Sequence, residues 1–531
     1  MKNKIYALLV LFGLLLAGCD KGFEELNESP DRPVTADLSA VYNKISNSFR
    51  NIGTEQTFLR NELLLPSTQL TGLSRRIGVD PISRTQGSLW ENYYKALKNI
   101  VFLEREIAAS EGLNTFSAEA MLKIAKAFLT LKITDLYGDI PFTEAAHGFV
   151  VGEDQVLRPV YDDSKSIYLA CLEDLKWASD NINTTGDGTL LSFAGVDSYY
   201  GGDLLKWEKL ANTLRLRYAL RISEKEAAIA DEIISEILGG GKPVIEGTSS
   251  TSEDFYYNRI SADDRSWLQP AFRAAGSNGV RLGENIWNFM SDSDAQDGSG
   301  IFDPRLYIYF EPNKDDLWIP VTQDFDAVDP VDDADIYHGS RANDYHNERH
   351  LNHYAAINTN FVFSRTNRVP VVTSSEAYFL KAEAYARGIG VAKDMTLAEE
   401  NYYNGIRASV NYWYEVVDDL EKWQYPITIS MPPTETEMNN FLSHAQVAFT
   451  GTDDEKLNKI YGQRWASLFW LPEEAHFLQS RTERTPLIGS RGDFYRMPYP
   501  ETEEANNKQN FDAAVTKMGG NGFDIKLWWM K

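Results

Sequence analysis

Residues 118–136 constrain the fold of this chain more than any other segment. Their apolar side chains first recur at the spacing of one helical face and then extend beyond it: Met121, Ile124, Ala125, Phe128, Leu129, Leu131, Ile133 and Leu136. A helix that is apolar on more than one side must be covered by other structure on each of those sides. The segment therefore predicts a helix that lies between other helices.

Helical periodicity recurs along the chain, whereas strand-like alternation is scarce. The segments that show it are 87–108, 162–181, 203–223, 374–387, 396–413 and 455–470. The sequence therefore predicts a mostly α fold with few short strands.

Two neighbouring segments form the clearest helical hairpin, SSEAYFLKAEAYARG followed by TLAEENYYNGIRASVNYW. Ser374 or Ser375 is predicted to cap the first helix, and Gly388 is predicted to end it. Small side chains allow a neighbouring helix to approach closely, and the first helix carries four: Ala377, Ala382, Ala384 and Ala386. The pattern resembles a tetratricopeptide-type hairpin of roughly 34 residues. We expect such hairpins to form the scaffold.

The helical periodicity becomes rare between about residues 240 and 370. This stretch begins at the glycine run 239–241, contains SDSDAQDGSG and DFDAVDPVDDADIY, and has few periodic segments. It is predicted to be a loop-rich insertion in the helical scaffold. Ligand contacts tend to lie in such loops.

The N-terminus reads as a secretory signal. Lys2 and Lys4 precede an apolar run over residues 5–16. The run is shorter than the about 20 residues that a membrane-spanning helix needs. The order Leu16, Ala17, Gly18, Cys19 resembles the bacterial lipobox, whose cysteine is acylated, although an ordinary signal peptide with a chance cysteine is the alternative.

The lipobox predicts the organisation of the whole chain. Residues 1–18 are expected to be cleaved, and Cys19 is expected to carry the lipid, including palmitate, that anchors the protein to a membrane. Residues 19–34 are polar and contain two prolines, which is typical of a flexible tether. Residues 35–531 are expected to form a single folded domain.

The net charge and the number of cysteines limit which ligands and which disulfides this chain can have. The chain has 77 Asp and Glu against 52 Lys and Arg, which gives a formal net charge of −25. This charge argues against nucleic acid or an anionic membrane surface as a partner, whereas a neutral ligand or a protein fits better. Once Cys19 is acylated only Cys171 remains, so no intrachain disulfide can form. We expect Cys171 to be a small core residue.

Two motifs could bind a metal. The segment HNERHLNH places His346, His350 and His353 at spacings that one helical face could present, but the zincin pattern needs a glutamate where Asn347 stands. A solvated polar segment is the preferred interpretation.

The other motif is the acidic run Asp292, Asp294, Asp297, which meets Gly298 one residue out of step with an EF-hand loop. The run is compatible with a structural calcium ion, and no other cofactor is predicted. The sequence contains neither a GxSxG nucleophile motif nor a phosphate-binding loop, and no carboxylate pair lies in a setting that suggests a raised pKa. We therefore predict that the protein is not an enzyme.

Five stretches resemble the SusD/RagB family, and the resemblance is closest to its SusD-like 2 branch. They are AKAFLTLKITDLYGDIPFTEA (125–145), YYGGDLLKWEKLANTLRLRYALRIS (199–223), EAYFLKAEAYARG (376–388), QRWASLFW with RTERTP (463–486), and RMPYPETEEANN leading to LWW (496–529). In these motifs Gly138 is expected to end one helix, Asp203 to cap the next, and Trp207 to pack inward.

The resemblance implies a function, because members of this family are nutrient-binding surface lipoproteins of Bacteroidota. It implies that the protein is anchored in the outer membrane and faces the cell exterior. There it would capture an oligosaccharide and pass it to a SusC-like TonB-dependent transporter. A peptide ligand, a surface glycan-degrading enzyme and a purely structural helical scaffold are the alternatives.

A glycan site should pair exposed aromatic rings, which stack on the C–H faces of sugars, with polar side chains that bind the hydroxyl groups. The candidates are Trp267, Trp287, Tyr309 and Trp318 in the insertion and Arg75 in the loop LTGLSRRIGVD. An aromatic side chain in the core is the alternative for each ring.

Overall fold

The computed structural model describes residues 37–50, 55–73, 80–110, 114–149, 155–182, 193–248, 252–259, 280–292, 295–313, 315–322, 353–358, 367–418, 431–484 and 494–531. The expected signal peptide, Cys19 and the whole expected tether lie outside these residues. In the described part, no helix has both the length and the apolar character needed to cross a membrane.

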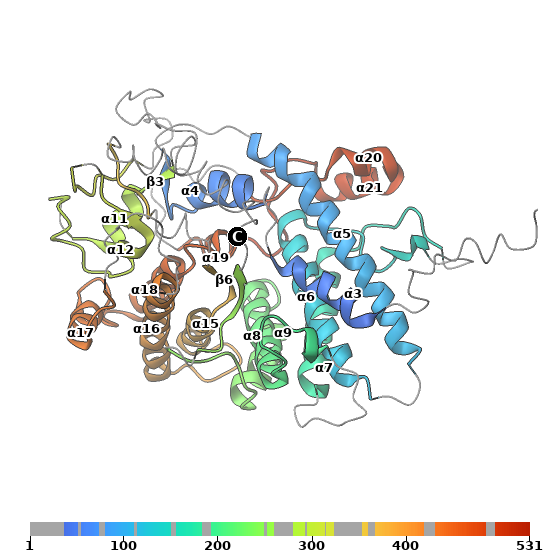
Figure 1. Ribbon diagram of the computed structural model, residues 1–531, viewed down its shortest axis with the longest axis horizontal. Coiled ribbons are helices and arrows are strands. Elements are labelled where there is room, and N and C mark those ends of the chain that lie inside the picture. Colours follow the sequence, from blue (N-terminus) through green and yellow to red (C-terminus); the bar gives the residue numbers. More distant parts are fainter. Residues whose placement is uncertain are drawn as a thin grey trace, which may run out of the picture.

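The first group of helices comprises α3 (Leu38–Ser46), η1 (Asn47–Phe49), η2 (Glu55–Leu64), α4 (Leu65–Ser67), α5 (Asp80–Ala108), α6 (Phe116–Tyr137), η3 (His147–Phe149), α7 (Ser164–Asn181), η4 (Ala194–Val196), α8 (Leu204–Ile222), α9 (Ala227–Ile234) and η5 (Ser235–Gly239). In this group, α3, α5, α6 and α7 lie on the right of Figure 1, α8 and α9 lie near the middle, and α4 lies to the left. Helix α6 packs against both α5 and α7 and is buried along most of its length. The prediction of a helix between other helices is confirmed.

The second group contains the helical hairpin (Figure 1). It comprises α15 (Ser374–Arg387), α16 (Met395–Asp418), α17 (Glu435–Ser443), α18 (Asp453–Ser467) and α19 (Pro472–Thr482). Helices α15 and α16 pack along each other, and Gly405 of α16 lies so close to the ring of Phe379 that an added Cβ would approach it to 2.9 Å. The predicted hairpin is confirmed. After this group, α20 (Glu501–Asn506) and α21 (Lys508–Met518) return to the first group, beside α5 in Figure 1.

One predicted cap in the hairpin is wrong. The N-cap of α15 is Thr373, whose side chain accepts a hydrogen bond from the Glu376 backbone N–H at 3.2 Å. Thr373 follows a strand and keeps extended backbone angles, as an N-cap requires. Ser375 lies inside the helix, and its hydroxyl donates to the Gly405 carbonyl of α16. Gly388 ends α15 in the left-handed conformation, with φ of 68°, as predicted.

Other local predictions are confirmed in the first group. Gly138 ends α6 with φ of 86°, and Asp203 caps α8 by accepting from two backbone N–H groups. Trp207 and Cys171 are both fully buried.

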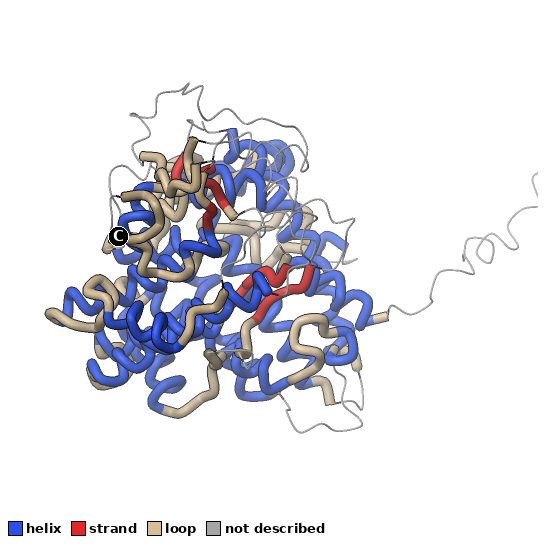
Figure 2. The backbone as a smooth tube through the Cα atoms, turned by 60° about the vertical axis from the view of Figure 1, so that its left-hand side comes forward, coloured by secondary structure: helices blue, strands red, loops and turns tan. Residues whose placement is uncertain are grey.

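Strands are few and short, as predicted. One antiparallel sheet has the order β1 (Gly72–Leu73), β3 (Val280–Arg281), β5 (Ala356–Ile357), β4 (Phe310–Glu311). A second contains β2 (Phe255–Arg259) and β6 (Asn367–Val372). The two sets lie apart, among the helices (Figure 2). The described part of the insertion adds two short helices, α11 (Glu284–Met290) and α12 (Leu306–Tyr309).

The buried apolar residues form two large clusters. One lies among α3 and α5–α8 and includes the C-terminal Trp529, and the other lies among α11, α12 and α15–α19. A smaller cluster connects α8 and α9 to α15. The two helical groups are therefore packed into one body.

Candidate functional site

Three of the predicted aromatic residues are buried. Trp287, Tyr309 and Trp318 expose only 4%, 1% and 6% of their surfaces and belong to the second apolar cluster. The ring of Tyr309 stacks on Phe469 at 4.1 Å between centroids. The expected exposure of these rings is wrong, because all three pack within the second apolar cluster. Their role in binding is a separate prediction.

Two other predicted residues, Trp267 and Arg75, lie outside the described residues. Among the described aromatic residues of the insertion, Tyr307 is half-buried and its ring lies edge-on to Trp318 at 5.6 Å. Tyr307 therefore keeps more accessible surface than the three buried rings.

The metal-binding motifs are only partly described. Asp294, His346 and His350 lie outside the described residues. Asp292 pairs with His444 at 3.0 Å, and Asp297 accepts hydrogen bonds from the backbone and hydroxyl of Ser299. The described residues contain no group of three or more side chains placed to hold a metal ion.

A chain of buried charges joins the two helical groups, and sequence reasoning missed it. We call it the core ion network. It alternates in sign along the order Asp135, Arg221, Glu474, Arg217, Glu376, Arg464, Glu383, Arg481. These residues come from α6, α8, α15, α18 and α19, and each exposes at most 9% of its surface. Helical spacing could have indicated that each charge lies on a buried face, but not which partner it meets.

Burial and neighbouring charges act in opposite directions within the network. Burial raises the pKa of Asp135 to about 6, although Arg221 and the Tyr168 hydroxyl favour its charged form. Burial also acts to raise the pKa of Glu383, but Arg481, Arg387 and other donors lower it to about 2. Every carboxylate of the network contacts a guanidinium, so the arrangement acts as a structural connection between helices.

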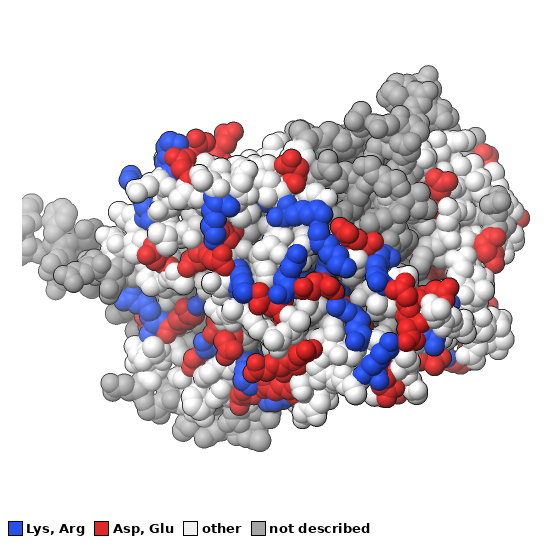
Figure 3. All heavy atoms as spheres, turned by 180° about the vertical axis from the view of Figure 1, so that it is seen from behind, with Lys and Arg blue, Asp and Glu red and all other residues white. Residues whose placement is uncertain are grey.

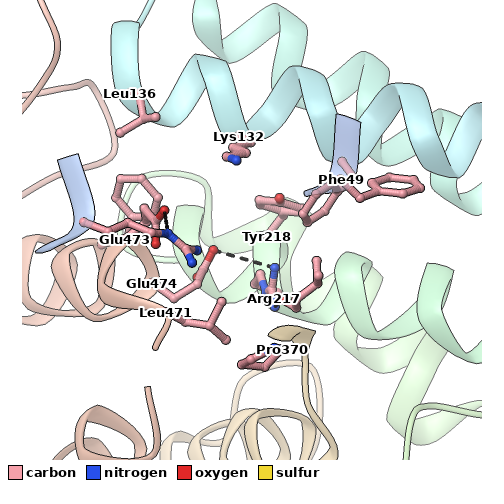
Figure 4. Close-up of a pocket in the computed structure, with 13 residues that line it drawn as sticks. Phe49, Lys132, Leu136, Arg217, Tyr218, Pro370, Leu471, Glu473 and Glu474 are labelled. Carbon is pink, nitrogen blue, oxygen red and sulfur yellow. Dashed lines mark hydrogen bonds and ion pairs between the residues drawn. The ribbon is translucent and has the colours of Figure 1, made fainter. Parts of the chain in front are cut away.

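A small cavity borders the network (Figure 4). Its volume is about 40 Å³, which is room for little more than a water molecule. Glu474 and Arg217 face each other at its edge, with 3.6 Å between Oε1 and Nη1, and Lys132 of α6 lies on the opposite side (Figure 4). A sugar does not fit there.

A larger cavity, here called the outer cavity, lies among α3, η1, α5 and α6 and has a volume of about 320 Å³. Its lining is Lys44, Asn47, Ser48, Arg50, Glu55, Leu89, Asn92, Tyr93, Lys95, Ala96, Asn99, Leu129, Lys132 and Ile133. Lys44, Asn47 and Lys95 are exposed, whereas the apolar lining residues are buried, so the cavity has an open mouth and an apolar floor. This volume lies within the about 300–1,000 Å³ typical of small-molecule sites.

Charges of both signs are mixed on one face of the molecule (Figure 3). On the face shown in Figure 3, Lys and Arg lie interspersed with Asp and Glu. The outer cavity differs from this pattern, because four of its described lining residues are cationic and one, Glu55, is acidic. Lys132 lines both cavities and pairs with Glu55 at 2.5 Å.

A family model supplies the decisive comparison. The model of the SusD-like 2 family, described as starch-binding and associating with the outer membrane, matches residues 38–490. The chain belongs to the SusD-like 2 family. The predicted family is therefore confirmed, and its description places its members at the outer membrane. No match was found among curated proteins.

Solved structures share the fold of this SusD-like 2 protein. One is described as a chitin-binding protein, with 22% identity and a TM-score of 0.69, and the match covers 93% of this chain and all of that one. Another, described as a Bacteroidetes SusD-like protein, has 21% identity, a TM-score of 0.67 and the same coverage. A SusD homologue from Parabacteroides distasonis has 19% identity and a TM-score of 0.69, and the match covers 93% of this chain and 98% of that one. At these identities the likeness shows the fold alone.

Proposed function

We propose that this protein is a lipid-anchored surface protein that captures an oligosaccharide and delivers it to a SusC-like TonB-dependent transporter. The match of the SusD-like 2 family model across residues 38–490 carries this proposal. The lipobox-like order ending at Cys19 supports it, as does the outer cavity with its apolar floor and polar mouth. The half-buried Tyr307 offers an additional ring in the insertion for stacking on a sugar.

Ligand binding is tested by calorimetric titration of the purified domain against oligosaccharides and, separately, peptides. We expect saturable binding to at least one oligosaccharide and no change in its chain length after long incubation. Binding of peptides alone would contradict the glycan ligand. Shortened products would instead indicate an enzyme, and no binding at all would favour a structural scaffold.

Delivery is tested by affinity capture of a tagged copy, expressed at its native level, from membranes solubilised in mild detergent. A transporter barrel should be recovered in comparable amount, because anchoring to one surface makes even a modest interface sufficient. Recovery of the protein alone, together with unchanged ligand uptake after its deletion, would contradict the delivery role.

Replacing Cys19 with alanine is expected to release the protein from the membrane fraction, because the acylated thiol is the proposed anchor. Acyl chains contribute about 0.8 kcal/mol per buried CH₂ group, so their loss removes most of the membrane affinity. Cell fractionation and immunoblotting measure the change. Replacing Cys171, which is buried in α7, with serine is the matched control and should leave the fractionation unchanged. A Cys19 variant that stays with the membrane would exclude this anchor.

A further inference from the structure

The outer cavity carries a local charge opposite to that of the whole chain. Glu55 is paired with Lys132 at 2.5 Å, which leaves Lys44, Arg50 and Lys95 as the remaining charged groups of the described lining. Lys95 contacts Glu91 at 2.7 Å, but both side chains are 66% exposed. Such an exposed pair is weak, so it competes little with a ligand. A cationic cavity on a chain with net charge −25 therefore selects for an anion.

The uncharged lining fits a sugar. The side-chain amides of Asn47, Asn92 and Asn99 and the hydroxyl of Ser48 supply both donors and acceptors, as sugar hydroxyl groups require. The floor is apolar and buried and includes Leu129. Apolar surface with a few placed polar groups is the usual composition of a small-ligand site, and here it can contact the C–H face of a sugar ring.

Arg50 is held in place from outside the cavity. Its guanidinium carbon lies 5.4 Å from the centre of the Tyr257 ring. A guanidinium presents its N–H groups in a planar fork that matches a carboxylate, and an oriented fork loses less freedom when it binds.

We propose that the outer cavity binds a hexuronate unit, that is, a sugar carrying a carboxylate. This proposal takes one point from the proposed function, namely that the ligand is a saccharide. The carboxylate would contact the cations at the mouth, and the ring and its hydroxyl groups would contact the floor and the amides. The cavity thereby gives the protein a preference for acidic over neutral saccharides. The net charge of the whole chain, −25, would by itself favour a neutral ligand.

The test uses the mature domain and calorimetric titration with triuronates of the glucose, galactose and mannose series and their neutral counterparts. At least one triuronate should bind tenfold or more tightly than its neutral counterpart. Its affinity should fall further as salt is raised, because salt screens exposed charges. The double variant Lys44→Glu/Lys95→Glu should weaken that triuronate tenfold or more and change neutral binding less than twofold. Lys44→Gln/Lys95→Gln should weaken it by a smaller factor, with unchanged thermal unfolding for both variants.

The control is Lys508→Glu, which changes a 63% exposed lysine on α21 and should leave triuronate binding unchanged. If every triuronate binds no better than its neutral counterpart, or if the cavity variants bind it like the wild type, the hexuronate site is excluded while the proposed function stands on neutral binding. If neither class binds, both proposals fail. If sodium sulfate displaces the triuronate at equal concentration, the cavity recognises an anion only, and the sugar assignment is wrong.

Discussion

Replacing Glu383 with alanine is expected to lower the free energy of unfolding by about 3–5 kcal/mol, because it removes one partner from a buried charge network. Both Glu383 oxygens accept from Arg481, at 2.6 and 2.8 Å, and Oε1 also accepts from Arg387 at 2.8 Å. The alanine variant removes both carboxylate contacts of Arg481, which exposes only 3% of its surface. Urea unfolding followed by circular dichroism measures the loss.

The matched control is Glu246→Ala, which removes a 2.8 Å ion pair with Lys381. Lys381 lies on α15, the helix that also carries Glu383. The Glu246 side chain is 53% exposed, so its loss should cost less than about 1 kcal/mol. Equal losses for the two variants would contradict the role of burial in this network.

The effect of Glu383 should also depend on pH. Burial alone would raise its pKa, but the guanidinium groups lower it from the ordinary value of 4.5 to about 2. A depressed carboxylate pKa contributes stability that is complete above pH 4.5 and is lost as pH falls toward 2. The stability difference between wild type and Glu383→Ala should therefore be constant from pH 6 to 8 and shrink below about pH 4.5. A difference that grows on acidification would contradict this assignment.

Replacing Trp465 with alanine is expected to cost about 3–5 kcal/mol through the cavity it leaves. Trp465 is fully buried on α18, and its indole N–H donates to the Thr68 carbonyl at 2.8 Å. Phe289 lies edge-on to its ring at 5.4 Å. Denaturant unfolding of the variant measures the loss.

The variant Trp465→Phe distinguishes the contribution of packing at this position from the contribution of the indole hydrogen bond. The Thr68 carbonyl also accepts from the Gln479 side chain at 2.9 Å, so it keeps a partner after this substitution. The phenylalanine variant should therefore lose clearly less stability than the alanine variant. Equal losses would show that the hydrogen bond, and not the packed volume, is the main contribution.

The helices could be predicted from the sequence because their pattern is local. The segment 203–223 corresponds to α8, and the expected cap Asp203 accepts from the backbone N–H of Leu205 and Lys206. The cap of α15 was misplaced because Ser374, Ser375 and Thr373 are all chemically suitable. Only the backbone angles set by the preceding strand decide among them.

The candidate site was much less predictable. A tryptophan in a loop-rich stretch can face solvent or the core, and Trp287 faces the core because α11 packs against other helices. The outer cavity combines Lys44 of α3 with Lys95 of α5 and Lys132 of α6, and no local pattern indicates that these three side chains line one space. The partners in the core ion network are also far apart in the sequence. Arg221 and Glu474, for example, are separated by 253 positions.

Arg60 of η2 and Glu473 of α19 form a buried ion pair that, like the core ion network, joins the two helical groups. The two residues are 413 positions apart, so at about 5–20 residues per second Arg60 is synthesised roughly 20–80 s before its partner. Contacts of such long sequence separation slow folding. Until the second helical group has been synthesised, Arg60 and Arg217 lack their carboxylate partners Glu473 and Glu376. We expect the native state to form only after nearly the entire polypeptide has left the ribosome, with a nascent chain that depends on chaperones until then.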